Sequence, residues 1–183
     1  IICIPSYANN ILHDAETILP GANKAKKAEI LFYAVKAKNY TIINLALQYN
    51  AKADYQDEQG YTTLMYAAPN LSLESLQRLL AAGGSKTVTY TNFLGMTALN
   101  YAETRTYTSS DMTQKLLSLM KNSDLKYTSS TFWQTATVDD VNNKLNGSYK
   151  GHTPLYYAVE TASYPVLEAM MGYNPANMAD LST

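Results

Sequence analysis

The two histidines, His13 and His152, are the residues of this chain best suited to acid–base chemistry near neutral pH. His152 lies in the segment GHTPLYYAVE, residues 151–160, which also holds a Thr-Pro pair and two adjacent tyrosines. A catalytic histidine needs a nucleophile or a carboxylate as its partner, yet the next acidic residue is Glu160, eight positions on. His13 stands beside Asp14, but adjacent positions on a helix point in different directions. The histidines therefore predict no acid–base site.

One segment has the glycines and the lysine of a phosphate-binding loop. In AAGGSKT, residues 81–87, Ser85 separates the glycines from Lys86, whereas the nucleotide-binding pattern needs glycine directly before the lysine. We predict no strand before this segment, and its glycines are typical of a helix end. The patterns G-x-S-x-G and H-E-x-x-H do not occur in the sequence either. We therefore expect no enzymatic activity.

The composition limits metal and disulfide chemistry. A single cysteine cannot form an internal disulfide, and one cysteine with two histidines cannot supply the ligands of a structural Cys/His zinc site. The alternating carboxylates and closing glutamate of a calcium loop do not occur. We expect no metal and no other cofactor.

The charge and the tyrosine content narrow the class of partner. The 183 residues carry a net charge of −1, so no excess of positive charge favours nucleic acid or an anionic membrane. No apolar run is long enough to span a bilayer. The 16 tyrosines suit half-buried binding surfaces, because the ring buries apolar area while the hydroxyl stays polar. Tyrosine-rich codon usage is the alternative explanation.

The first residues, IICIPSYANN, change from apolar to polar at Ala8. The small residues Ser6 and Ala8 resemble the cleavage region of a secretory signal peptide, and cleavage after Ala8 would also remove Cys3. This pattern favours export, periplasmic or secreted, over a cytoplasmic location. The alternative is that residues 1–8 form an extended segment that packs on the first helix.

An internal repeat organises most of the chain. Segments that contain Leu-x-x-Ala recur, and the aligned alanines Ala34 and Ala67 are 33 residues apart. Each segment continues to a second apolar site. The segments are 31–51, 64–84, 94–122 and 151–174, with a shorter unit over 131–147 in which Val138, Val141 and Leu145 have helical spacing.

The same start signal precedes three of the apolar helices. A threonine suited to the N-cap stands before the helix, and a glycine that a tight turn needs stands two residues earlier. These pairs are Gly60 and Thr62, Gly95 and Thr97, and Gly151 and Thr153, and Pro154 follows the last at the first helical position. Gly83 is expected to end the second helix of its unit.

The pattern G-x-T-x-L-x-x-A followed by L-x-x-L-L-x-x-G, clearest in GYTTLMYAAPNLSLESLQRLLAAGG and GHTPLYYAV, resembles the ankyrin repeat. The resemblance implies an all-α solenoid of about five antiparallel helix pairs with β-turn fingers along one edge. The family's usual histidine position holds Phe32, Met65, Asn100 and Tyr156, so its hydrogen-bonding role is lost or replaced.

The predicted organisation follows from this resemblance. An N-terminal segment (1–8) and a capping helix (9–25) precede repeats at about 26–55, 56–88, 92–125, 128–147 and 148–178, and a tail (179–183) follows. The GANKAKKAE stretch is interpreted as a polar turn before the first repeat helix.

The resemblance also implies where a partner would bind, because the family uses its finger tips and inner helices. The corresponding positions are Glu58, Gln59, Tyr61, Asn70, Phe93, Leu94, Met96, Arg105, Tyr149, Lys150, His152 and Glu160. Phe93 and Leu94 at a turn tip are the least expected on a plain surface. Alternatively, the long finger folds back and buries Phe93.

We therefore predict a non-enzymatic module that binds a protein partner. A peptide or small-molecule pocket at the irregular third and fourth repeats is an alternative, in which Trp133 anchors the pocket; otherwise Trp133 fills the gap left by a short helix. An exported bacterial factor that binds a host protein is a further alternative, suggested by the weak consensus. Met170, Met171 and Met178 leave an apolar C-terminal end, through which self-association is possible.

Overall fold

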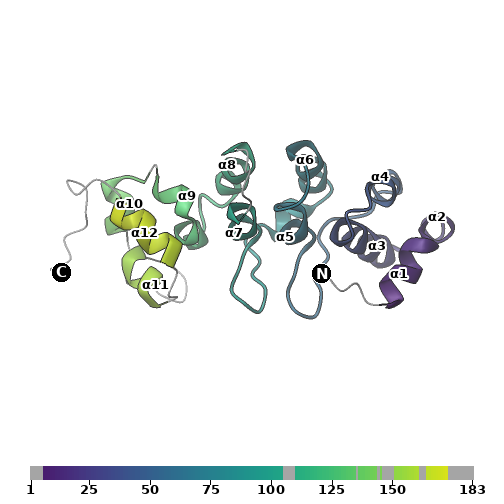
Figure 1. The fold of residues 1–183 in the computed structure, drawn as a ribbon, viewed down its shortest axis with the longest axis horizontal. Coiled ribbons are helices and arrows are strands. Elements are labelled where there is room, and N and C mark those ends of the chain that lie inside the picture. The colour runs from purple at the N-terminus through teal and green to yellow at the C-terminus, as the bar shows by residue number, and fades with distance from the viewer. Residues whose placement is uncertain are drawn as a thin grey trace. The chain divides into compact units, whose positions relative to one another are not determined.

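The computed structural model describes residues 6–104, 110–134, 136–143, 145, 151–160 and 164–172. Within these ranges the chain is helical, and its only β-pairing is an isolated antiparallel bridge between Gln56 and Thr62. The elements, labelled in Figure 1, are α1 (Ser6–His13), α2 (Ala15–Ile18), α3 (Lys24–Lys36), α4 (Tyr40–Gln48), α5 (Thr63–Ala67), α6 (Leu73–Ala81), η1 (Gly84–Thr87), α7 (Ala98–Glu103), α8 (Ser110–Leu119), η2 (Asp124–Thr128), α9 (Ser130–Trp133), α10 (Val138–Asn142), α11 (Pro154–Glu160) and α12 (Tyr164–Gly172). The predicted all-α class is confirmed.

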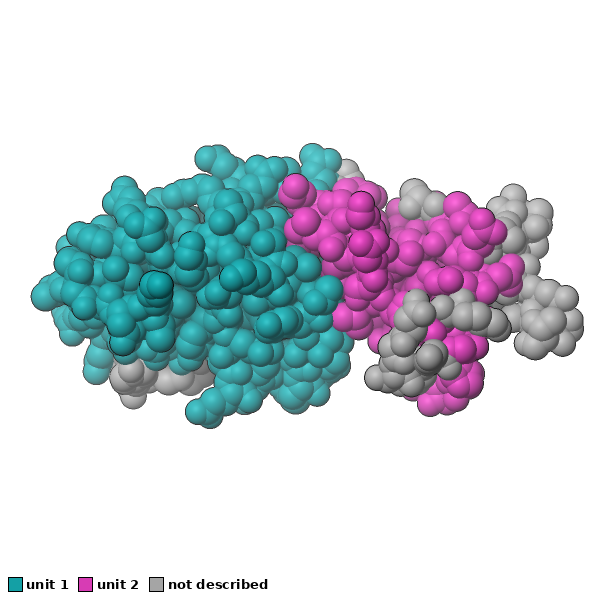
Figure 2. All heavy atoms as spheres, turned by 180° about the vertical axis from the view of Figure 1, so that it is seen from behind, with its two compact units in different colours: residues 1–112 teal, residues 113–183 magenta. Residues whose placement is uncertain are grey.

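The chain divides into two compact units. Unit 1 comprises Ile1–Met112 and unit 2 comprises Thr113–Thr183, drawn in teal and magenta in Figure 2.

In unit 1, helices α3, α5 and α7 form an inner row in which each helix packs on the next (Figure 1). Outside this row, α4 packs on α3 and α6 packs on α5, so α3 and α5 each have an outer partner. The aligned alanines Ala34, Ala67 and Ala102 are completely buried. Their small side chains allow the inner helices to approach closely, which explains the repeat of alanine in the sequence.

The predicted helix starts are confirmed. The Thr62 Oγ1 atom accepts a hydrogen bond from the Met65 backbone N–H at the start of α5, and Thr97 Oγ1 accepts one from the Asn100 N–H at the start of α7. Pro154 is the first residue of α11. At the other end of an outer helix, Gly83 follows α6 with a φ of 106°, a left-handed conformation that favours glycine.

The N-terminal region differs from the prediction of one capping helix over 9–25. The helical stretch begins at Ser6 and is interrupted at Asp14, whose ψ is 8°, so it forms the two short helices α1 and α2. The polar turn predicted for GANKAKKAE is also wrong beyond Asn23, because Lys24 already begins α3. The Asn23 side chain caps this helix by accepting a hydrogen bond from the Lys26 N–H at 2.9 Å.

Unit 2 is built on a small aromatic core. Its buried residues are Tyr127, Trp133, Ala136, Leu145, Ala158 and Val166, with α9 packed on α12 and α10 packed on α11. Trp133 is 1% exposed, and its Nε1–H donates a hydrogen bond to the Tyr127 carbonyl at 3.1 Å. Trp133 is the last residue of the four-residue helix α9 and fills the core of unit 2, as one of the two predictions had it.

The helix predicted over Val138, Val141 and Leu145 is shorter than expected. It ends at Asn142, and Leu145 lies beyond it although Leu145 is buried. The reason is that the Leu145 N–H donates to the His152 carbonyl at 2.9 Å, so this backbone pairs with the segment before α11 instead of continuing the helix.

Candidate functional site

Finger 1, residues 56–62, is a turn closed by the carboxylate of Asp57. Asp57 Oδ1 accepts hydrogen bonds from the backbone N–H groups of Gln59 (3.1 Å) and Tyr61 (2.8 Å). The Asp57 N–H donates to the Tyr61 carbonyl at 3.0 Å, and Gly60 adopts a φ of 83°. Because these backbone donors are satisfied within the turn, the finger has a defined shape of its own.

Finger 2, residues 91–97, is built in the same way on Asn92. Asn92 Oδ1 accepts hydrogen bonds from the N–H groups of Leu94 and Met96, both at 3.0 Å. The Asn92 N–H donates to the Met96 carbonyl, and Gly95 has a φ of 74°. The positive φ predicted for the glycine of each finger is therefore confirmed.

The two fingers lie side by side and contact each other directly (Figure 1). The Phe93 N–H at the tip of finger 2 donates to the Gln59 carbonyl of finger 1 at 3.0 Å. Gly60 is so close to finger 2 that a Cβ atom there would lie 2.9 Å from Asn92 Cα. The finger tips thus form one continuous edge.

Most of the residues predicted at these tips are accessible. Phe93 is 67% exposed and Leu94 is 59% exposed, so the alternative in which the finger buries Phe93 is wrong. Glu58 and Gln59 are also exposed, whereas Tyr61 and Met96 are half-buried. The structure therefore gathers six predicted residues on the two neighbouring fingers.

Asn70 has a structural contact that the prediction did not include. Its Nδ2 atom donates to the Tyr66 carbonyl at 2.9 Å, just beyond the end of α5. It is half-buried and secures the end of the inner helix.

A cluster of aromatic rings connects the fingers to the inner helices. The ring of Tyr61 stacks on Tyr66 with a centroid distance of 5.4 Å, and lies 6.0 Å from Tyr101 and 6.1 Å from Phe93. Tyr66 in turn lies 5.5 Å from Phe32 of α3. We call Tyr61, Tyr66, Phe93 and Tyr101 the aromatic face of unit 1, and Phe32 is the buried ring behind it.

Hydrogen bonds and burial fix the hydroxyl groups of this face. Asn92 Nδ2 donates to the Tyr101 hydroxyl at 2.8 Å, and that hydroxyl donates to the Tyr61 hydroxyl at 3.3 Å. Burial raises the pKa of Tyr101 to about 12, and its hydrogen bond to Tyr61 adds to the increase. Burial also raises the pKa of Tyr66 to about 12, with a further contribution from the negative charge of Asp57. These phenols therefore stay neutral at physiological pH and act as hydrogen-bonding groups.

The sequence prediction missed Tyr66, Tyr101 and the two turn-closing residues Asp57 and Asn92. A signal for the tyrosines was present, since the aligned alanine of every Leu-x-x-Ala segment is preceded by tyrosine, at Tyr33, Tyr66, Tyr101 and Tyr157. All four are half-buried. The turn residues also had a signal, because Asp or Asn stands three residues before the finger glycine in both cases.

The remaining predicted residues are not part of this face. His152 and Glu160 belong to unit 2 and are exposed there. The His152 ring stacks on Tyr156, with centroids 4.0 Å apart and planes 17° from parallel. Arg105, Tyr149 and Lys150 lie outside the described residues.

Other kinds of site find no support in the described residues. In these parts of the chain, His, Cys, Asp and Glu side chains form no group of three that could hold a metal ion. Nor is any helix there both long enough and apolar enough to cross a membrane. What the aromatic face can offer is ring surfaces, neutral hydroxyl groups and an exposed apolar tip.

Comparison with known proteins agrees with the repeat that the structure shows. A family model described as ankyrin repeats (3 copies) matches residues 7–90 and residues 31–129, together more than half of the chain. Searches of curated proteins and of solved structures gave no match. The stacked helix pairs, the finger turns and this match together establish that the chain belongs to the ankyrin-repeat family.

Proposed function

We propose that the fingers and the aromatic face of unit 1 bind a partner protein, and that the chain acts through this binding and not through catalysis. Ankyrin repeats are generally protein–protein interaction modules and are typically not enzymes.

The observation that carries the proposal is the exposure of Phe93 and Leu94 on a structured turn. Their side chains are 67% and 59% exposed, while the backbone beneath them is fixed by Asn92 and by the hydrogen bond to Gln59. Holding apolar groups in water at a defined position gives no folding benefit, but it preorganises a contact for a partner. Residues of this kind commonly anchor interfaces.

The aromatic face beside the tip suggests the rest of the contact. Tyrosine is enriched at interfaces because it buries a large ring and still offers a hydroxyl. The chain's own Lys36 ammonium lies 5.0 Å from the Tyr66 ring centroid, so this ring already accepts a cation. We expect a partner segment with apolar side chains against the tip and hydrogen-bonding groups over the tyrosine hydroxyls.

The test compares the exposed finger tip with an exposed aromatic side chain elsewhere in unit 1. Phe93 and Leu94 are changed together to Ser, and Tyr40, 52% exposed on the outer helix α4, is changed to Ser as the control. Proteins captured from a lysate by the unmodified chain are identified, and their affinity for each variant is measured by calorimetry. We expect the Phe93→Ser/Leu94→Ser variant to bind at least about tenfold more weakly and Tyr40→Ser to bind normally.

Unchanged affinity in the double variant, with circular dichroism showing an intact fold, would reject the assignment. Equal losses in the double variant and the control would also reject it, because a specific finger contact would then be excluded.

Export remains a prediction from the sequence. Cleavage after Ala8 would remove the first three residues of α1 and leave a chain that begins with Asn9. Mass spectrometry of the secreted fraction tests this, since a chain that retains residues 1–8 would contradict it.

A further inference from the structure

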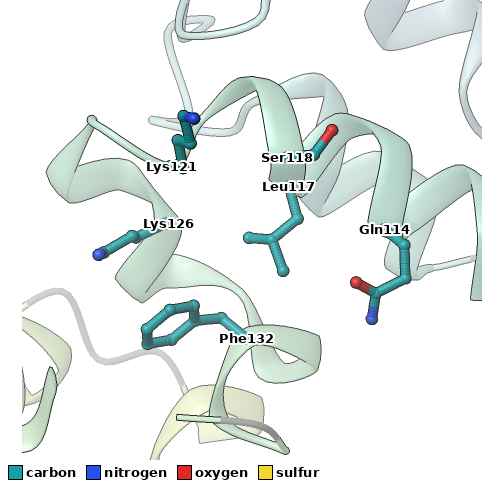
Figure 3. Close-up of a pocket in the computed structure, with 6 residues that line it drawn as sticks. All are labelled: Gln114, Leu117, Ser118, Lys121, Lys126 and Phe132. Atoms are coloured by element: carbon teal, nitrogen blue, oxygen red, sulfur yellow. The ribbon is translucent and has the colours of Figure 1, made fainter. Parts of the chain in front are cut away.

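Unit 2 contains a hollow of about 270 Å³ between the end of α8 and the segment η2–α9. Figure 3 shows the six residues that line it: Gln114, Leu117, Ser118, Lys121, Lys126 and Phe132. None of them belongs to the fingers or to the aromatic face, so this hollow is a separate feature of the molecule.

The lining changes in character from one side to the other. In Figure 3 the two lysines lie at one side, Gln114 lies at the opposite side, and Leu117 and Phe132 lie between them. Leu117 and Phe132 are half-buried and offer the hollow part of their apolar surface. A ligand that matches this order has a negative group, then an apolar group, then a group that hydrogen-bonds to an amide or hydroxyl.

The positive side is held in place by unit 2 itself. The Lys126 ammonium lies 4.8 Å from the Tyr127 ring centroid, 5.2 Å from that of Phe132 and 3.6 Å from Asp140 Oδ1. The Asp140 carboxylate is already engaged, because its Oδ2 accepts hydrogen bonds from the N–H (3.0 Å) and the hydroxyl (2.8 Å) of Thr137. Lys126 is therefore preorganised beside the hollow.

Lys121 supplies the accessible charge. Its side chain is exposed, and it forms no ion pair within the described part of the chain. Lys121 and Lys126 also line a smaller hollow of about 170 Å³ that contains Asp124 and is otherwise polar. The lining of the larger hollow has two lysines and no carboxylate, and since Lys126 is already paired with Asp140, it is the charge of Lys121 that favours an anion on that side.

We propose that this hollow binds a carboxylate attached to a compact apolar group, as at the C-terminal residue of a polypeptide. The carboxylate meets the ammonium groups of Lys121 and Lys126, and the apolar side chain packs on Phe132 and Leu117. A preceding amide group reaches Gln114. A hollow of about 270 Å³ is smaller than most pockets for drug-sized ligands, so it suits one such residue.

The single tryptophan provides the measurement. Trp133 is the only Trp of the chain, and its ring lies 5.2 Å from that of Phe132 in an edge-to-face arrangement. A ligand that packs on Phe132 changes the surroundings of this pair, so titration of the full chain can be followed by tryptophan fluorescence. The probes are a tryptophan-free hexapeptide that ends in leucine with a free carboxylate, the same peptide with a C-terminal amide, and N-acetyl-leucine.

We expect a saturable fluorescence change with the free-acid peptide and at least about tenfold weaker binding of the amide. If N-acetyl-leucine binds as tightly as the peptide, a free small acid is the natural source of the carboxylate; if the peptide binds more tightly, a chain terminus is. Equal binding of acid and amide, or no saturable change with either acid, overturns the proposal.

A matched pair of variants locates the site. Lys121→Gln removes the exposed charge that lines the hollow, while Lys115→Gln removes an exposed charge from α8 that does not line it. We expect Lys121→Gln to weaken binding of the free-acid peptide by about threefold or more and Lys115→Gln to leave it unchanged. Equal effects of both variants would contradict the assignment. Phe93→Ser is expected to bind the peptide normally, so this proposal and the proposed finger interface can fail independently.

Discussion

The residue at the usual ankyrin histidine position now caps a helix in two repeats of this chain. Met65 Sδ accepts the Thr62 N–H at 3.4 Å, and Asn100 Oδ1 accepts both the N–H (2.9 Å) and the hydroxyl (2.8 Å) of Thr97. The sequence predicted the threonine caps correctly, because a local rule governs them. The sequence did not predict whether Met65 and Asn100 take over the hydrogen bond of the usual histidine, since that depends on side-chain geometry.

Asn100→Ala is expected to destabilise unit 1 by about 1–2 kcal/mol, because it leaves the N–H of the buried Thr97 without its acceptor. Asn100→Asp retains the acceptor oxygen and is expected to recover most of the loss. Urea denaturation followed by circular dichroism measures both. Equal stability of the alanine variant and the parent would show that the cap contributes nothing.

The raised pKa values of Tyr66 and Tyr101 predict a loss of stability in alkaline solution. A folded-state pKa of about 12 against the ordinary 10.0 means that the unfolded chain releases these protons first. Their contribution is complete below about pH 10 and is lost as the pH rises towards 12. In urea denaturation at stepped pH, Tyr66→Phe is expected to lose stability less steeply than the parent. Tyr40→Phe, on the exposed face of α4, serves as control and is expected to follow the parent.

At the scale of elements, the contact between fingers was the part that the sequence could not show. Each finger was predictable from its glycine and threonine, because those signals lie within a few residues. The pairing of Phe93 with Gln59 joins residues of different repeats, and the aromatic face likewise depends on which rings the stacked helices bring together. Such contacts follow from packing and not from local preference.

Substitutions at two glycines distinguish the contribution of the contact between the fingers to stability from that of the turn conformation. Gly60 and Gly95 both have positive φ, but an added Cβ would meet Asn92 Cα at 2.9 Å at Gly60 and nothing within 4 Å at Gly95. Gly95→Ala is expected to cost about 1–2 kcal/mol from the backbone alone. Gly60→Ala is expected to cost at least about 1 kcal/mol more, because the added Cβ fits only if the backbone of finger 2 moves away from it. Equal losses of unfolding free energy for the two variants in denaturation experiments would show that the contact between the fingers does not contribute to stability.

At the scale of the whole molecule, the sequence predicted one array over residues 26–178, and the structure divides the chain into two compact units between Met112 and Thr113. The fourth repeat was correctly expected to be irregular. The core that stands in place of a regular helix pair was not predictable from the sequence. It combines Tyr127 and Trp133 with residues of α11 and α12, which come together only in the folded chain. The family model likewise ends at residue 129.

Trp133→Ala tests whether the units are stabilised separately. Removing this buried ring is expected to cost unit 2 about 3–5 kcal/mol. Hydrogen exchange measured by mass spectrometry should then accelerate in η2, α9, α11 and α12, and change little in α3 and α5. Equal acceleration in both units would show that they unfold together.

The finger tip has a consequence for how this protein can evolve. Phe93 is positioned by its backbone N–H, and the turn beneath it is closed by Asn92, so neither Phe93 nor Leu94 needs a particular side chain for the finger to form. Substitutions of Phe93 and Leu94 are therefore expected to leave the stability of the fold almost unchanged. A lineage can therefore change its partner through one or two codons at this tip while Gly60, Asn92 and the inner helices stay under constraint.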